Sequence, residues 1–508
     1  MNNHKILSFN PKSPNFILII SYICLGLIGI LRHSMWRDEL NAWLVARDSN
    51  SLIEMFQAIK YEGHPGLWYL CLFVLKQITY NPISIQLFHF LLAASFTYLF
   101  IQFSPFTTKQ KILFTLGYFP LYEYLVVSRN YAIGVLCLFA FCTIYKIRTR
   151  NYLPLAFLLL LMANSNAYCL FIAIALGVSL IAEYFWRKPL GYSTQASIFN
   201  QLTSFGIFLT GIILSFLQLI PPQDSILQGG VQLNIQFSFH HLVASLSRLW
   251  SSYILILVPG DTQFYSLCLF AVISICLAVF IFISLIKKPV IACFYLLATS
   301  EIIFFTYVKF LGSPRHYGHL YIIFITAIWL ASYYSPSNLL LQPLSKLISP
   351  SWLKFIHKYR KHLLIVILSA QLIAGVVAYS RDLLVPYSAS KETAQFIHRE
   401  NLNDMFMVGS QDFAMAPLAG YLQRKLYYPE SEKMGSFVLF NSQRREVDLA
   451  TVLNQVNQLL SQEKKDILLI LNYQLDRSST SLSIEPLGYF TNSFIYNENY
   501  YLYKIKYE

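Results

Sequence analysis

The chain has 508 residues, of which 56% are hydrophobic, 16% aromatic and only 12% charged. Soluble proteins carry about 25% charged residues, so this composition excludes an ordinary soluble enzyme, and it also excludes disordered and collagen-like chains. The net charge of +13 would suit nucleic acid, but the basic residues lie in short gaps between apolar blocks and no recognition motif accompanies them. We therefore expect no nucleic-acid partner.

Apolar blocks of about 20 residues follow one another from Ile17 to about Ser380. Because a stretch of that length crosses the hydrocarbon layer of a bilayer, the pattern predicts a polytopic α-helical membrane protein with about 11–13 transmembrane helices. The candidate spans are residues 15–31, 83–103, 111–127, 131–146, 152–164, 167–186, 199–219, 264–286, 290–310, 317–334 and 362–380.

The basic clusters orient these spans, because positive residues collect in cytoplasmic loops. With the spans above, four clusters fall on one side, which we assign to the cytoplasm: Lys146/Arg148/Arg150, Arg187/Lys188, Lys287/Lys288 and Lys354/Lys358/Arg360/Lys361. The opposite side then receives a first outer loop (33–80), a short break (128–130), a large outer loop (220–263), residues 311–316 and everything after Arg381.

The apolar block 64–80 does not fit a simple span. It has about 17 residues and contains Lys76, so its length is marginal for crossing the hydrocarbon layer. If it crossed, every later basic cluster would change side. We therefore predict a juxtamembrane or re-entrant helix that stays on the outer side, packed on protein.

The composition changes after Arg381, which divides the chain into a membrane domain (1–381) and a second domain (382–508). In the second domain we expect an amphipathic helix from Lys391, a strand at 406–409, a helix at 414–422, a buried strand at 467–471 and a closing hairpin at 494–506. Strands that alternate with helices predict a small α/β domain.

The first outer loop contains the acidic pair Asp38-Glu39, flanked by Trp36 and Trp43. A carboxylate can act as general base towards a hydroxyl, and a neighbouring acid can position the acceptor or a divalent ion. The alternative is an interfacial amphipathic helix, with the tryptophans as belt residues and the acids simply solvated.

Three further polar breaks lie on the same predicted side. His64 precedes Pro65 just before an expected helix N-terminus, a place that suits a phosphate. Arg129 and Tyr131 lie at one break between apolar blocks, and Arg315 and His316 lie at another. Arginine suits phosphate through its planar fork of donors, although a structural histidine and snorkelling arginines would explain the same residues.

Together these motifs resemble the GT-C membrane glycosyltransferases, in particular the protein O-mannosyltransferase and aminoarabinose transferase superfamily. Trp36-Arg37-Asp38-Glu39 matches the acidic motif of that family's first loop. His64-Pro65-Gly66-Leu67 is similar to its His-Pro-Pro-Leu and departs from it at the second proline. The resemblance covers residues 33–70 in motif and the membrane region in layout, and the C-terminal domain resembles the extracytoplasmic tail of bacterial members.

The resemblance implies transfer of a hexosyl or pentosyl group from a polyprenyl-phosphate donor to an extracytoplasmic acceptor, with inversion, at a bacterial inner membrane. Asp38 would be the base, and Glu39 would assist acceptor or metal positioning. The donor phosphate would be held by His64, Arg129, Tyr131, Arg315 and His316. The resemblance implies no definite cofactor. A divalent cation stays an open alternative, and Asp38 and Glu39 would be its ligands.

Two other classes of function stay open at this point. A transporter or lipid flippase would also have many spans and intramembrane charges, although it predicts inverted repeats that the sequence lacks. A ligase or polymerase that uses a lipid-diphosphate glycan would share the same residues. The sequence does not identify the sugar or the acceptor.

Overall fold

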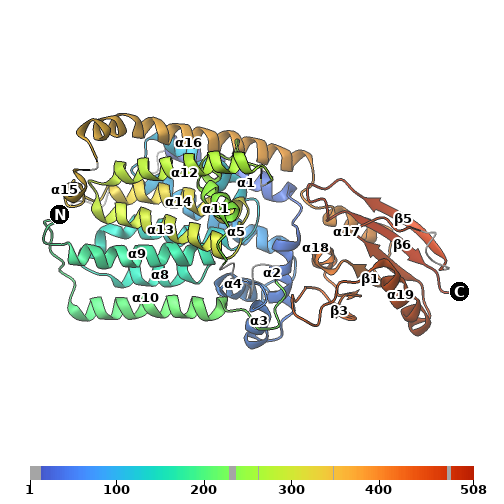
Figure 1. Ribbon diagram of the computed structural model, residues 1–508. Coiled ribbons are helices and arrows are strands. Elements are labelled where there is room, and N and C mark those ends of the chain that lie inside the picture. The colour runs from blue at the N-terminus through green and yellow to red at the C-terminus, as the bar shows by residue number, and fades with distance from the viewer. Residues whose placement is uncertain (1–12, 228–235, 261, 347, 477–481) are drawn as a thin grey trace.

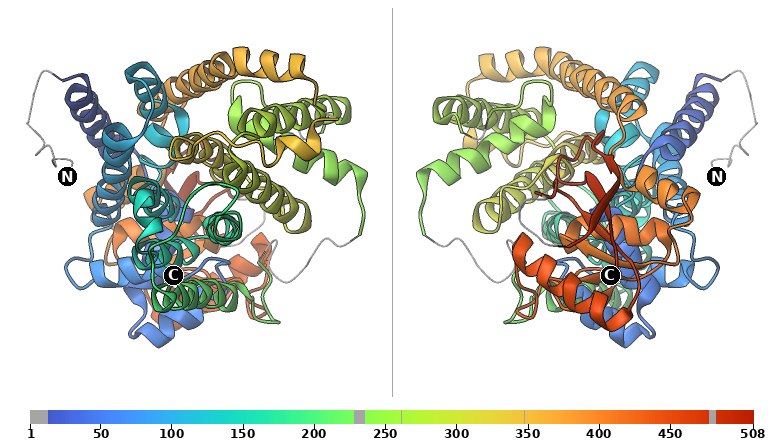
Figure 2. Two further views of the ribbon diagram at one scale, coloured as in Figure 1. Left: turned by 90° about the vertical axis from the view of Figure 1, so that its left-hand side faces the viewer. Right: turned by 90° about the vertical axis from the view of Figure 1, so that its right-hand side faces the viewer.

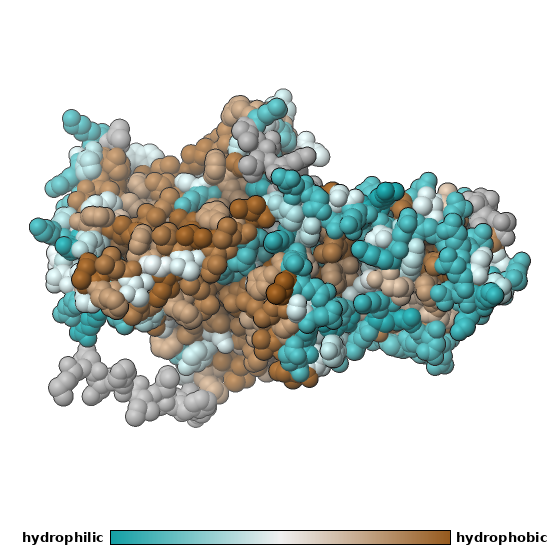
Figure 3. All heavy atoms as spheres, turned by 90° about the horizontal axis from the view of Figure 1, so that it is seen from below, coloured by the Kyte–Doolittle hydropathy of each residue, from teal (hydrophilic) through white to brown (hydrophobic). Residues whose placement is uncertain are grey.

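The computed structural model describes residues 13–227, 236–260, 262–346, 348–476 and 482–508. A helical bundle and a small sheet domain lie end to end, and the long helix α16 (Pro350–Leu384) connects them (Figure 1). Seen from below, apolar side chains cover the bundle between a polar far end and the polar sheet domain (Figure 3). This distribution fits a bundle that sits in a bilayer.

The bundle is built almost entirely of helices. Besides α16 it contains α1 (Pro14–Arg32), α2 (Arg37–Asp48), α3 (Leu52–Ile59), α4 (Leu67–Leu75), α5 (Ile83–Phe103), α6 (Thr108–Thr115), the π-helix η1 (Tyr118–Glu123), α7 (Tyr131–Ile144), the 3-10 helix η2 (Tyr145–Thr149), α8 (Leu153–Ala163), α9 (Ala167–Phe185), α10 (Ile198–Leu219), α11 (Phe239–Tyr253), α12 (Phe264–Leu285), α13 (Pro289–Val308), α14 (Pro314–Ala331) and α15 (Leu341–Leu344).

Eight helices in the described part of the chain are long and apolar enough to cross a membrane. They are α1, α5, α7 with η2, α9, α10, α12, α13 and α16, and each coincides with a predicted span. The other three predicted spans are shorter or interrupted. The span at 152–164 is the 11-residue helix α8, the span at 111–127 is divided into α6 and η1, and the span at 317–334 is α14, which begins in polar residues.

The block 64–80 forms the short helix α4, which has nine residues. At 1.5 Å per residue such a helix is about 14 Å long, less than half the hydrocarbon thickness of about 30 Å. It packs against α2 and α5 at the end of the bundle that faces the sheet domain. The structure thus has a helix too short to cross the hydrocarbon layer where the sequence predicted one that does not cross, and its location on the outer side stays a prediction.

The segment predicted to be a large outer loop, 220–263, is not only a loop. It contains α11, which packs against α12, α13 and α14 and buries Val243, Leu249 and Tyr253. The prediction missed this helix because it is amphipathic: seven of its 15 side chains are polar, so it does not form a continuous apolar block. Residues 228–235 and 261 of the predicted loop lie outside the described residues.

The C-terminal domain is an α/β domain. It comprises α17 (Ser390–Arg399), β1 (Phe406–Ser410), α18 (Asp412–Leu422), β2 (Leu426–Tyr428), β3 (Lys433–Gly435), α19 (Leu449–Glu463), β4 (Ile467–Leu471), β5 (Ile484–Phe490) and β6 (Tyr500–Ile505). The strand order is β3-β2-β1-β4-β6-β5, with β1 parallel to β2 and β4 and the other neighbours antiparallel.

Both faces of this sheet are covered. Side chains of β4 alternate, so that Leu468 and Ile470 pack with α17 and α18, while Leu469 and Leu471 pack with α19. This explains the continuous apolar run Ile467–Leu471, which is typical of a central strand buried on both sides. The predicted hairpin at 494–506 is displaced, because β6 pairs with β5 at 484–490.

Candidate active site

The acidic pair lies in the first turn of α2, where negative side chains are favoured by the helix dipole. Successive helical residues point about 100° apart, so the two carboxylates enter different surroundings. Trp36 and Trp43 are not interfacial belt residues, because only 5% and 0% of their surfaces are exposed. The amphipathic-helix alternative for this segment is therefore wrong, and α2 is buried in protein.

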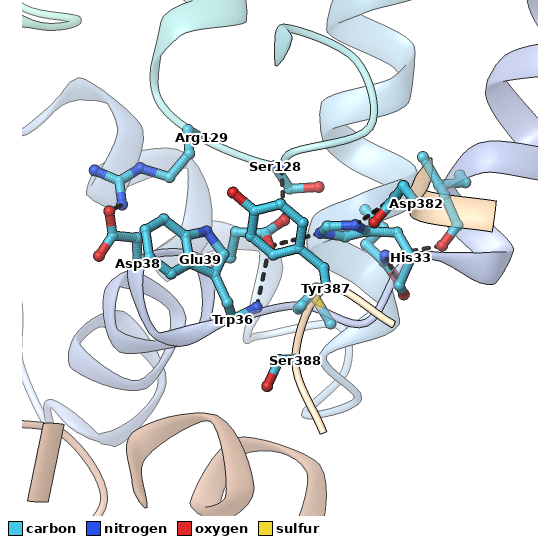
Figure 4. Close-up of polar contacts among 12 residues, drawn as sticks. His33, Trp36, Asp38, Glu39, Ser128, Arg129, Asp382, Tyr387 and Ser388 are labelled. Atoms are coloured by element: carbon cyan, nitrogen blue, oxygen red, sulfur yellow. Dashed lines mark hydrogen bonds and ion pairs between the residues drawn. The ribbon is translucent and has the colours of Figure 1, made fainter. Parts of the chain in front are cut away.

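Asp38 is held between two arginines from distant parts of the chain. Its Oδ2 lies 2.8 Å from Nη1 of Arg129 and 3.0 Å from Nη2 of Arg315. A quarter of the Asp38 side chain remains exposed, so the carboxylate is reachable from outside the protein. The structure thus brings together three of the residues that the sequence placed in one site (Figure 4 shows Asp38 and Arg129).

The electrostatics of Asp38 follow from these contacts. Burial alone would raise the pKa of Asp38, but the charges of Arg129 and Arg315, with a contribution from Arg37, outweigh it and hold the pKa below its usual value. Asp38 also raises the pKa of Arg129 against the opposing effect of burial. The carboxylate is therefore ionised, and while both arginines bind it, it is a weak base.

Glu39 points away from Asp38 into a fully buried network (Figure 4). Its Oε1 accepts a 2.6 Å hydrogen bond from the backbone N–H of Ser128, and its Oε2 accepts one from the N–H of Trp36. The same Oε2 lies 2.9 Å from Nε2 of His33, whose Nδ1 lies 2.9 Å from Oδ2 of Asp382. Glu39 thereby ties α2 to the turn that carries Arg129 and to the end of α16.

The histidine of this network is charged. Burial lowers the pKa of His33, but Asp382 and Glu39 on either side of the ring raise it to about 10. A buried imidazolium between two carboxylates satisfies the rule that buried charges are paired. Because both oxygens of Glu39 already have protein partners, its environment suits a positioning role better than contact with an acceptor or a metal.

His64 lies beside the arginine pair, with its Nε2 3.3 Å from Nη2 of Arg129. Burial and the charge of Arg129 lower the pKa of His64 to about 3, so its ring is neutral near pH 7. The backbone N–H groups of Gly66 and Leu67 at the start of α4 already donate to Gln218 and Asn164. His64 is thus in the site but adds no positive charge.

Glu62 is a site residue to which the sequence assigned no role. Its Oε1 accepts a 2.9 Å hydrogen bond from Nδ2 of Asn41, and its Oε2 accepts one from the Tyr69 hydroxyl. Burial raises the pKa of Glu62 to about 7. The charge of Arg129 lowers this pKa, but the negative charge of Asp38 partly offsets that effect. Its position two residues before His64, just ahead of the His64–Leu67 motif, was the signal that could have found it.

The two remaining predicted residues flank the arginines. His316 caps α14, because its Nδ1 accepts the 2.9 Å hydrogen bond from the N–H of Ser313, and its ring lies 5.4 Å from that of Tyr168. Tyr131 begins α7 next to Arg129. In the part of the chain that the structure describes, the Tyr131 hydroxyl and Nε of Arg315 are buried without a hydrogen-bond partner. Such groups are costly to bury, so they indicate a place for a polar ligand.

The surroundings of Asp38 do not fit a divalent cation. Two guanidinium groups lie within 3.0 Å of its oxygen, and they would repel a second positive charge at that point. The Glu39 oxygens have protein partners, as described above. Among the described residues, no group of three or more His, Cys, Asp or Glu side chains is placed to hold a metal ion.

The C-terminal domain holds α2 from the other side. The Tyr421 hydroxyl of α18 accepts a 2.8 Å hydrogen bond from the N–H of Met35, and Oε1 of Glu498 accepts one from the N–H of Arg37. Further along the helix, Asn41 Oδ1 accepts a hydrogen bond from the N–H of Val438. The helix that carries Asp38 is therefore positioned by both domains.

No family model matches this sequence, and no curated protein is similar to it in sequence. Among solved structures, the crystal structure of ArnT from Cupriavidus metallidurans bound to undecaprenyl phosphate matches 96% of this chain and 97% of its own, with a TM-score of 0.51. The chain has an ArnT-like GT-C fold. The two sequences are 12% identical, so the similarity is one of fold. It includes the C-terminal domain as well as the membrane bundle, and it agrees with the fold class predicted from the sequence.

Proposed function

We propose that this protein is a membrane glycosyltransferase that moves a sugar from a polyprenyl-phosphate donor to an extracytoplasmic acceptor. The observation that carries the proposal is the placement of Asp38 between Arg129 and Arg315 at the end of the bundle next to the C-terminal domain. The ArnT structure with the same fold has undecaprenyl phosphate bound, which supports a lipid-phosphate ligand here. The location would be a bacterial inner membrane, with the site on the outer face.

The arginines would bind the donor phosphate. Arg129 and Arg315 provide two positive charges, and Nε of Arg315 and the Tyr131 hydroxyl are among the buried polar groups of the described residues that have no protein partner. Charge-assisted hydrogen bonds from a guanidinium to a phosphate are about twice as strong as neutral ones, and they can form in parallel pairs. Neutral His64 and His316 would line this site without adding charge.

The chemical step would be a single displacement. An acceptor hydroxyl oxygen attacks the anomeric carbon, the bond from that carbon to the phosphate oxygen breaks, and polyprenyl phosphate leaves with the bonding electrons. The proton of the hydroxyl passes to Asp38. Since attack and departure occur on opposite sides of the carbon, the configuration inverts.

Donor binding would also activate the base. While Asp38 is paired with both arginines its pKa is low. A phosphate that takes over guanidinium donors adds negative charge beside the carboxylate and weakens that pairing. The pKa of Asp38 then rises, and the carboxylate becomes a better proton acceptor at the moment when the donor is in place.

Incubation of the purified protein with radiolabelled polyprenyl-phosphate sugars and a membrane extract as acceptor source tests the proposal. We expect release of polyprenyl phosphate together with transfer of label to extract components. The Asp38→Asn variant serves as the matched control and should release almost none. Absence of release with every hexosyl and pentosyl donor, together with donor movement across vesicle bilayers, would assign the protein to the transporters instead.

A further inference from the structure

A second charged site lies at the end of the bundle opposite Asp38. An open cavity of about 670 Å³ is bordered by the end of α12, the α12–α13 turn and the first turns of α16. Five lysines and arginines line it: Lys287, Lys288, Lys354, Lys358 and Arg360. Among the described residues, no acidic side chain is part of the lining.

The positive charge of this cavity has no counterpart in the surrounding chain. From residue 262 to residue 381 the sequence contains a single acidic residue, Glu301, which lies in the middle of α13. None of the five lining cations forms an ion pair with an acid among the described residues. Lys288 donates a hydrogen bond to the carbonyl of Tyr334, and Nζ of Lys358 lies 5.2 Å from the centroid of the Tyr359 ring. Like charges held together without a partner favour an anionic ligand.

The shape of α16 places the cavity at the membrane surface. Its 35 residues make a helix of about 52 Å, longer than the hydrocarbon core of about 30 Å, so its first turns extend to the level of the lipid head groups. These turns expose 60% of Trp352, 52% of Phe355 and 38% of Tyr359, at spacings that share one helix face. Aromatic residues of this kind, interleaved with lysines, are typical of helices at a membrane interface.

The cavity continues into surfaces that face lipid. Helix α16 packs against α12 at the periphery of the bundle (Figures 1 and 2). Helix α12 exposes Ile275 and Val279, which lie eight and four residues before the lining residue Ile283 and therefore on the same helix face. An occupant can thus have a phosphate among the cations and hydrocarbon along the two helices. A free phosphate or a nucleotide would use only the first of these features.

We infer that this cavity binds the head group of an anionic phospholipid, with its acyl chains along α12 and α16. The phosphate would contact Lys287, Lys354, Lys358 and Arg360, and the exposed aromatic residues of α16 would lie at the level of the glycerol. This site is separate from the donor site and does not depend on the proposed function. Basic pockets between transmembrane helices are a recurrent form of lipid recognition.

Native mass spectrometry of the full chain in detergent, titrated with phosphatidylglycerol or phosphatidylcholine, tests this site. One variant removes lining charges (Lys354→Gln, Lys358→Gln, Arg360→Gln). A matched control removes three exposed charges assigned to the same side that do not line the cavity (Arg150→Gln, Lys188→Gln, Lys361→Gln). We expect phosphatidylglycerol to bind the lining variant at least about tenfold more weakly than the wild type, and the control variant within about twofold of it.

Four results would overturn the inference. Equal losses of phosphatidylglycerol binding in both variants would indicate diffuse surface charge, and unchanged binding in both would mean that the cavity cations do not bind the lipid. Equal binding of phosphatidylcholine would exclude recognition of an anionic head group, and displacement of the lipid by millimolar inorganic phosphate would indicate a soluble anion. The single change Lys287→Glu, at an exposed position, provides a second variant should the triple variant melt at a lower temperature. It should weaken phosphatidylglycerol binding in the same direction, and unchanged binding would count against the site.

Discussion

The two ends of the helical bundle contain similar cationic side chains in contrasting surroundings. At the end next to the C-terminal domain, Arg129 and Arg315 are largely buried and meet Asp38 from two different turns. At the opposite end, Lys354 and Lys358 are exposed on a helix and no described acid pairs with them. Burying a charge is expensive unless it is paired, so the buried arginines need an acid held in place by the tertiary structure, whereas the exposed lysines need no protein partner.

This contrast predicts the largest loss of activity for Asp38→Asn. The amide keeps the shape of the side chain but cannot accept a proton, so we expect transfer to fall by about 10²–10⁴-fold, with expression and donor binding retained. The measurement is initial rate with a saturating polyprenyl-phosphate sugar. Asp224→Asn, the same change in an exposed acid near Tyr61, is the control and should leave the rate unchanged. Activity of Asp38→Asn within about threefold of wild type would remove Asp38 as the base.

Substitution of Arg315 should act on the donor. Arg315→Ala removes a charged hydrogen-bond donor worth roughly 1.5–3 kcal/mol, which corresponds to about a 10- to 100-fold increase in donor KM. Arg315→Lys should have a smaller effect, because lysine keeps the charge but not the planar fork. Acceptor KM should change little in either variant. An unchanged donor KM, accompanied only by a lower melting temperature, would reduce Arg315 to a structural residue.

The buried network around His33 should appear as a pH dependence of stability. The pKa of His33 is raised from 6.5 to about 10 in the folded protein, so its contribution is complete below about pH 6.5 and is lost as the pH rises towards 10. We expect the wild-type melting temperature to fall over this range. His33→Gln should melt several degrees lower at pH 7 and show a flatter profile. Parallel profiles for the two proteins would contradict the assignment.

A smaller effect is expected for Glu62. Its pKa of about 7 means that it is neutral below and charged above that pH, and the charge raises the basicity of nearby Asp38. The wild-type rate should therefore increase by a few-fold as the pH rises through about 7. Glu62→Gln should lose this dependence and keep most of the activity at low pH. A rate profile that is unchanged by the substitution would show that Glu62 does not affect the step.

No change in activity is expected for a cysteine at Asn81, an exposed position between α4 and α5. In a variant without the eight natural cysteines, Asn81→Cys should react with a membrane-impermeant thiol reagent from the outer face of intact cells. A cysteine at Lys354, on the opposite end, should react only after the cytoplasmic face is opened. Labelling of position 81 only from the cytoplasmic face would mean that residues 64–80 cross the membrane.

The features that depend on hydrophobic pattern and order along the chain could be predicted from the sequence. The long apolar helices, the short helix α4 and the strand Ile467–Leu471 follow from length and periodicity alone. The helices α11 and α19 were missed because they are amphipathic: their apolar residues recur at helical spacing, but neither forms a continuous apolar block. The short strands β2 and β3, with three residues each, carry too little pattern to be recognised.

The sequence could predict which residues belong to the site, but not how they contact one another. Motifs placed Asp38, Arg129 and Arg315 on one side of the membrane. In the structure these residues are in contact although up to 277 positions separate them in the sequence. The different surroundings of Asp38 and Glu39 could not be foreseen, because they depend on contacts made only in the folded chain. Ser128 and His33 contact Glu39, and Asp382 pairs with the other side of the His33 ring.

The contact between Arg37 and Glu498 has a consequence for the order of biosynthesis. Glu498 lies immediately before the last strand, β6, yet it accepts a hydrogen bond from the helix that carries Asp38. During synthesis α2 emerges more than 450 residues before this partner. The end of the bundle next to the C-terminal domain therefore lacks its final support until residue 498 has followed and β6 has joined its sheet. The proposed catalysis should begin only in a chain whose C-terminal domain has folded.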